Sequence, residues 1–200
     1  MKMKRVLIPV LTACSVLSAH ADLFQYVVNF SGANESPANI SQGIGFGTVD
    51  YDSAAHTLAL QVTFSGLTGL TTASHIHGPT ANPFALNAGV ATTTPSFAGF
   101  PLGVSSGTFA NTLDLTLASS FNANFVTANG GTLLGAETAL AAAMNDGKAY
   151  WNIHSSAFGG GEIRGFMVPV PEPGTLAIAG LAAAGLAVGA WRRRGAASRS

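Results

Sequence analysis

The chain has 200 residues, enough for one ordinary domain once sorting segments are set aside. Basic and acidic side chains cancel overall, but residues 22–168 carry only Lys148 and Arg164 against eight acids, a net charge of −6. This acidic body excludes a nucleic-acid partner, which requires a basic surface to neutralise phosphates.

The first 21 residues are predicted to be a secretory signal peptide. A basic start at residues 1–5 precedes a mostly apolar run at residues 6–17, which is the pattern of an export signal. The small residues Ala19 and Ala21 follow at the spacing that a signal peptidase reads. We therefore expect export, with cleavage after Ala21.

Cys14 offers an alternative processing site. The stretch Leu11-Thr12-Ala13-Cys14 is similar to a bacterial lipobox, which would make Cys14 a lipidated N-terminus. Cys14 is the single cysteine of the chain, so the exported body has no disulfide under either interpretation. Its stability must then come from a packed core.

Residues 22–168 are predicted to form one β domain, because apolar and polar residues alternate with a period of two between turns rich in Gly, Pro, Asn and Ser. The predicted strands cover residues 23–30, 43–51, 56–64, 107–117, 148–154 and 161–168. One helix is expected at Ala136–Asn145, and residues 80–106 are expected to form a long loop region or weak edge strands. This spacing of strands predicts an all-β sandwich or Greek-key barrel with one short helix.

Several short motifs of this body resemble those of the CHRD domain, the module named from chordin. The resemblance covers roughly residues 24–168 and lies in Gly32–Pro37, Ser65–Leu67, His75–Pro79, Asn152–His154 and Gly160–Gly165. It singles out Asn34, Glu35, Glu162 and Arg164 as family-motif residues. It implies an immunoglobulin-like or superoxide-dismutase-like β fold, and it implies no particular chemistry.

His75 and His77 are the first candidates for a metal site. They are two residues apart, so on a strand they would project from the same face. His154 could supply a third ligand if its strand lies nearby, and zinc or copper accepts such a set of nitrogens. The alternative is that the three histidines are hydrogen-bonded structural residues near a turn.

Glu162 and Arg164 are likewise two apart on a predicted strand. We expect a structural ion pair, or a link to a loop carboxylate such as Glu35, and the alternative is a polar ligand contact. The stretch Gly103–Gly107 matches the Gly-x-Ser-x-Gly motif in letters, but a strand pattern follows it where a nucleophile elbow needs a helix. The sequence therefore favours a protein that is not an enzyme.

The C-terminal end, residues 169–200, is predicted to be a sorting segment. Residues 175–191 contain no charge and would reach about 25 Å as a helix, the short end of a membrane span. The basic tail at residues 192–200 would then stay on the cytoplasmic side. Pro171 and Pro173 would keep the preceding segment extended and open to a protease.

This end resembles the PEP-CTERM sorting signal of Gram-negative bacteria. The resemblance lies in Val170, Pro171, Glu172 and Pro173, the apolar helix, and the cluster Arg192, Arg193 and Arg194. It implies recognition by an exosortase, a membrane-embedded protease, and passage through the inner membrane. Such signals are typical of bacteria that make extracellular polysaccharide and biofilm matrix, so exopolysaccharide and surface proteins are candidate partners.

Two classes of function remain. The first is an exported cell-surface or matrix-associated module that binds a ligand or has a structural role, with no cofactor. The second is a zinc- or copper-binding domain that uses His75, His77 and His154, with redox activity as an extension by fold analogy. Convergence of the three rings would favour the second class, and scattered rings would favour the first.

Overall fold

The computed structural model describes residues 23–171. The predicted signal peptide with Ala19 and Ala21, the lipobox alternative at Cys14, and the sorting segment from Glu172 onward, including the expected membrane helix, lie outside the described residues. Within residues 23–171, no helix is both long and apolar enough to cross a membrane.

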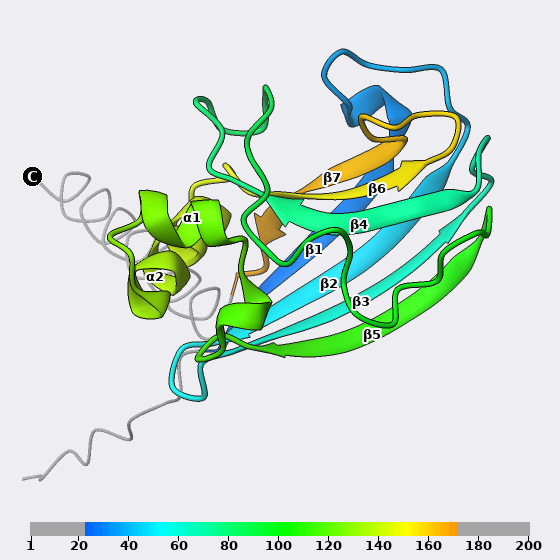
Figure 1. The fold of residues 1–200 in the computed structure, drawn as a ribbon. Helices are drawn as coiled ribbons and strands as arrows, with labels where there is room; N and C mark the ends of the chain where they lie inside the picture. The colour runs from blue at the N-terminus through cyan, green and yellow to red at the C-terminus, as the bar shows by residue number, and fades with distance from the viewer. Residues whose placement is uncertain (1–22, 172–200) are drawn as a thin grey trace, which may run out of the picture.

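Seven antiparallel strands form one sheet in the order β4-β6-β7-β1-β2-β3-β5 (Figure 1). Their bounds are β1 Leu23–Ser31, β2 Ile44–Asp52, β3 Thr57–Ser65, β4 Thr71–His77, β5 Gly107–Asp114, β6 Tyr150–Ser155 and β7 Ile163–Pro169. The all-β prediction is confirmed. The six predicted strands match β1, β2, β3, β5, β6 and β7 with ends shifted by a few residues, and β4 is the strand that the His75–His77 prediction required.

The sheet curls so that its two halves face one another across the core. Trp151 on β6 is fully buried, and its ring lies 5.5 Å from that of Phe30 on β1 and 6.5 Å from that of Phe109 on β5. The segment between β4 and β5 runs along the gap between these edge strands (Figure 1). It bonds β4 through the amide of Phe97, which donates to the Ser74 carbonyl at 3.0 Å.

Side chains alternate between the two faces of a strand, so β2 and β3 each have one buried face and one open face. Strand β6 differs, because it is buried along its whole length. Trp151 and Ile153 of β6 point into the core, and Tyr150, Asn152 and His154 point outward. The outward side chains are buried because loops fold over them. This covered outward face distinguishes the β4-β6-β7 half of the sheet.

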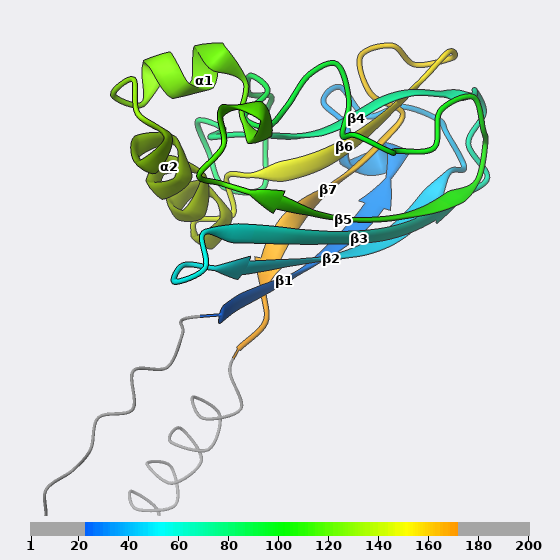
Figure 2. The same cartoon turned by 60° about the horizontal axis from the view of Figure 1, so that its bottom comes forward.

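Two α-helices lie together at one end of the sheet (Figure 2). They are α1 (Ala123–Ala128) and α2 (Leu133–Asn145), and two short 3-10 helices, η1 (Gly32–Asn34) and η2 (Ala118–Ser120), complete the described elements. The predicted helix is α2, which begins three residues earlier than expected because Thr132 caps it by accepting the amide of Gly135. The sequence does not predict α1, whose six residues are too few to show a helical period.

Glu137 anchors α2 to the sheet. Its carboxylate is buried, accepts the Tyr51 hydroxyl at 2.8 Å and lies 2.9 Å from Nδ1 of His56. Glu137 is thus the polar contact through which α2 docks on β2 and the β2–β3 turn.

Glu162 and Arg164 do not pair with each other. The Glu162 carboxylate accepts the Ser41 hydroxyl at 2.6 Å and the backbone amides of Thr68 and Gly69. Glu162 therefore ties the loops that precede β2 and β4 to the start of β7.

Arg164 forms the link to Glu35 that the sequence suggested as one option. Its Nε donates to the Asn34 carbonyl and lies 3.9 Å from the Glu35 carboxylate, and its Nη1 donates to the Asn87 side chain at 2.7 Å. The Asn34 side chain in turn donates to the carbonyls of Arg164 and Asn29. These motif residues hold two loops against the outward face of β7.

The buried position of Glu35 disfavours its ionised carboxylate. Burial raises its pKa from 4.5 to about 7, against the opposing effects of Arg164 and the Asn152 side chain, and its Oε1 is buried without a hydrogen-bond partner. The folded state therefore binds a proton more tightly than the unfolded state does, so this group lowers the stability as pH rises from 4.5 to about 7.

We expect Glu35→Gln to remove this pH dependence, because the amide has the shape of the neutral acid and cannot ionise. The free energy of unfolding of the variant should exceed that of the wild type by about 1 kcal/mol at pH 8 and should match it near pH 4. Urea denaturation across this pH range measures the free energy of unfolding of both proteins. The titration of all other groups is common to both and cancels in the difference between the two values. A constant difference at all pH values would contradict the assignment.

Candidate metal centre

The pairing of β4 with β6 brings the three predicted histidines together. His75 and His77 lie on β4, and the register sets His75 opposite Asn152 and Ala73 opposite His154 on β6. All three side chains therefore leave the same outward face of neighbouring strands. One ligand atom from each ring lies within 4.8 Å of those from the other two, and Nε2 of His75 is 3.0 Å from Nε2 of His154.

The Nδ1 atom of each ring faces a backbone carbonyl, two from the β4–β5 connection and one from the β6–β7 loop. Nδ1 of His75 lies 3.3 Å from the Pro95 carbonyl, Nδ1 of His77 lies 2.9 Å from that of Ala88, and Nδ1 of His154 lies 2.9 Å from that of Gly159. A carbonyl can only accept, so each Nδ1 must carry the proton and donate. This is the arrangement by which proteins orient histidines that bind a metal through Nε2.

The three Nε2 atoms are left as acceptors without a donor. A neutral imidazole has one proton, and here each proton is already on Nδ1. The lone pairs of His75 and His154 consequently face one another at 3.0 Å, and Nε2 of His77 is buried with no hydrogen-bond partner. Facing lone pairs repel, and a cation between them turns this repulsion into attraction.

Burial keeps these rings neutral. It lowers the pKa of His75 and of His77 to about 4 and also lowers the pKa of His154. Neighbouring imidazoles add to the effect at His75, and His154 and Arg164 add to it at His77. At neutral pH the cluster therefore presents uncharged nitrogens, the form that binds metals.

Tyr150 and Arg164 flank the cluster. The ring of Tyr150 stacks on that of His77 with centroids 4.7 Å apart, and the Arg164 guanidinium lies 4.5 Å from the centre of the Tyr150 ring. No carboxylate or thiolate joins the three histidines among the described residues. The donor set is thus all nitrogen, which suits zinc or copper and does not suit calcium or magnesium.

The ligand spacing is compatible with one ion. Two nitrogens at about 2.0–2.1 Å from a tetrahedral zinc lie about 3.3 Å apart. The pair His75–His154 is within a few tenths of this value, and His77 must approach by about 1.5 Å at most. Three protein ligands leave a further coordination position for water or another small ligand.

Sequence reasoning missed the groups that orient the rings. The carbonyls of Ala88, Pro95 and Gly159 belong to loops and carry no side-chain signal. Asn87 and Tyr150 also lack a motif that would mark them. His56, to which the sequence assigned no role, lies apart from the cluster and contacts Glu137.

The predicted sorting residues fall at the edge of the described chain. The amide of Val170 donates to the Gln25 carbonyl at 2.8 Å, and Pro171 is the last described residue. Glu172, Pro173 and the arginines at 192–194 lie beyond it.

Comparison with known proteins identifies two segments. A family model of the CHRD domain matches residues 26–167, and a model of the PEP-CTERM protein-sorting motif matches residues 169–194. No curated protein and no solved structure matches the chain. The sorting motif implies processing by an exosortase, and therefore export with transient membrane anchoring before placement at the surface or outside the cell. The chain belongs to the CHRD domain family and carries a PEP-CTERM sorting motif at its C-terminal end.

Proposed function

We propose that this exported protein is a binding module of the cell surface or extracellular matrix whose ligand is a zinc or copper ion held by His75, His77 and His154. The proposal unites the two classes of function that the sequence left open. The ion would bind where two loops and two strands meet, so it would also stabilise the fold in that region.

One observation carries the proposal: a ligand nitrogen of each ring lies within 4.8 Å of those of the other two, while the Nδ1 atom of every ring faces a carbonyl. Hydrogen-bonded structural histidines would use Nε2 as an acceptor for a protein donor. Here Nε2 of His77 has no partner, and those of His75 and His154 have only each other. A structural role alone leaves this arrangement unexplained.

A binding role without catalysis is part of the proposal. The Gly-x-Ser-x-Gly stretch ends at Gly107, where β5 begins, so the helix that a nucleophile elbow requires does not follow it. The superoxide-dismutase-like fold that the family resemblance implied is an analogy of fold and supplies no argument for redox activity.

We expect the exported protein, purified without a histidine tag, to contain about one zinc or copper ion per chain by elemental analysis. Excess metal should raise the melting temperature of the metal-free protein by about 5–10 °C, since binding at 100 times Kd adds about 2.7 kcal/mol. His75→Ala and His154→Ala should abolish both the metal content and this shift.

His56→Ala is the matched control, because His56 lies outside the cluster and is half exposed. This variant should bind the metal as the wild type does. Absence of metal from the wild type after exposure to both ions, or equal metal content in the wild type and His75→Ala, would refute the proposal.

The route to the surface is tested in the native host. Without the exosortase we expect the chain to remain in the inner-membrane fraction with its C-terminal segment intact, whereas the normal host should release a shorter form. Intact-mass analysis of the mature chain then distinguishes cleavage after Ala21 from lipidation at Cys14. A reporter fused after Val168 that is active only in the cytoplasm would contradict export.

A further inference from the structure

The outward face of β1, β2, β3 and β5 is a second surface with its own chemistry, on the other half of the sheet from the histidines. The strand register orders its side chains in rows. One row runs Asn29, Phe46, Thr63 and Thr108, and the next runs Val27, Thr48, Gln61 and Ala110. These two rows contain no charged side chain.

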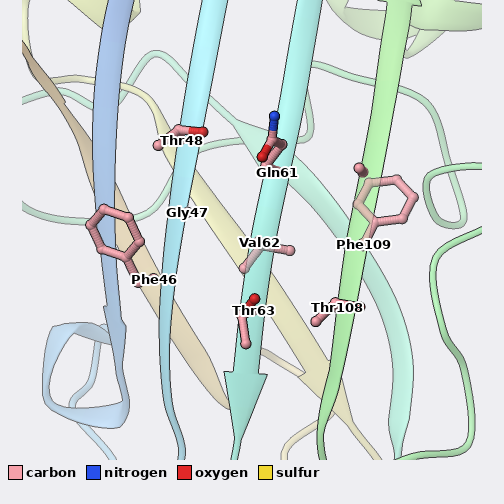
Figure 3. A pocket seen from close by; sticks show the side chains of 9 residues that line it. Phe46, Gly47, Thr48, Gln61, Val62, Thr63, Thr108 and Phe109 are labelled. Atoms are coloured by element: carbon pink, nitrogen blue, oxygen red, sulfur yellow. The ribbon is translucent and has the colours of Figure 1, made fainter.

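A shallow pocket of about 310 Å³ opens within these rows (Figure 3). Phe46, Thr48, Gln61, Thr63 and Thr108 surround it. Phe46 is 54% exposed. An aromatic ring so exposed in the middle of a sheet has given up the burial that normally stabilises it, which is expected where a ligand covers it.

The polar groups beside Phe46 are available to a ligand. Among residues 23–171, the side chains of Thr48, Gln61, Thr63 and Thr108 form no hydrogen bond with another protein group. Each hydroxyl can donate one hydrogen bond and accept others, and the Gln61 amide can do both. The pocket thus offers one apolar ring surrounded by groups that pair with hydroxyls.

Charge narrows the class of ligand. The acids of this face, Asp50, Asp52 and Asp114, lie in the rows beyond Gln61 and Ala110, and its four strands contain no Lys or Arg. An anionic polymer would therefore meet repulsion and no countercharge. A protein interface of ordinary composition would have a core with several aromatic residues or Arg, whereas this pocket has one exposed ring.

We propose that this pocket binds a neutral polysaccharide chain, with the apolar face of one sugar ring on Phe46 and sugar hydroxyls bonded to Thr48, Gln61 and Thr63. A sugar ring has an apolar face that fits the Phe46 ring and hydroxyls that pair with the polar side chains around it. The site is independent of the histidine cluster.

Native affinity electrophoresis of the protein released by its host tests the proposal, with dextran, glucomannan or hydroxyethyl cellulose in the gel as neutral probes and alginate as the anionic probe. We expect at least one neutral polysaccharide to slow the protein and alginate to leave it unaffected. Phe46→Ala should weaken the retardation at least about tenfold, and Phe46→Trp should keep it. Ile40→Ala is the control, because Ile40 is 89% exposed and lies outside the strands and the lining of the pocket.

Gln61 is another exposed residue of the pocket, and Gln61→Ala should also weaken the retardation. This second variant shows whether a loss at Phe46→Ala comes from lost binding or from misfolding. Retardation that Phe46→Ala and Gln61→Ala leave unchanged, retardation by alginate alone, or no retardation by any neutral probe would overturn the proposal. So would light scattering that shows a dimer dissociated by Phe46→Ala, since the face would then bind a second copy of the chain. Metal removal should not alter the retardation.

Discussion

Strands β4 and β6 pair so that His75 and His154 are offset by two residues across the pair, and this register determines the rest of the candidate site. If the pairing register of one strand shifted by one residue, the histidines of that strand would point into the core. With the register in place, each ring meets a carbonyl of the loops that cover the sheet, and the protons are committed to Nδ1. The convergence of lone pairs is then a consequence of backbone geometry and requires no further side chain.

Loops make this arrangement possible by covering a sheet face that would otherwise contact water. Their backbone groups need partners, and the outward face of β6 and β7 supplies these through Tyr150, His154 and Arg164. The family-motif residues belong to this covering layer: Arg164 and Glu162 each bind a different set of loops. The motif thus marks the residues that hold the loops over the sheet, and the histidines occupy the space that results.

The two halves of the sheet differ outside although they share one core. The β4-β6-β7 half has its outward face buried under loops, which cover the histidine cluster and Arg164. The β2-β3-β5 half leaves its outward face open, with hydroxyl, amide and one aromatic side chain exposed. This division separates the proposed ion site on one half of the sheet from the open face on the other half.

The sequence by itself determined the all-β class, most strand positions and helix α2, because periodicity and caps are local signals. It also identified the sorting motif and the CHRD family through short motifs at characteristic spacing. It named the three histidines but could not bring them together, since His75 and His154 are 79 residues apart and meet only through strand pairing. Only the tertiary structure decided three further features, because each depends on contacts between distant segments. These are which ring nitrogen carries the proton, the contact of Arg164 with Glu35 and not with Glu162, and the exposure of Phe46 beside unpaired hydroxyls.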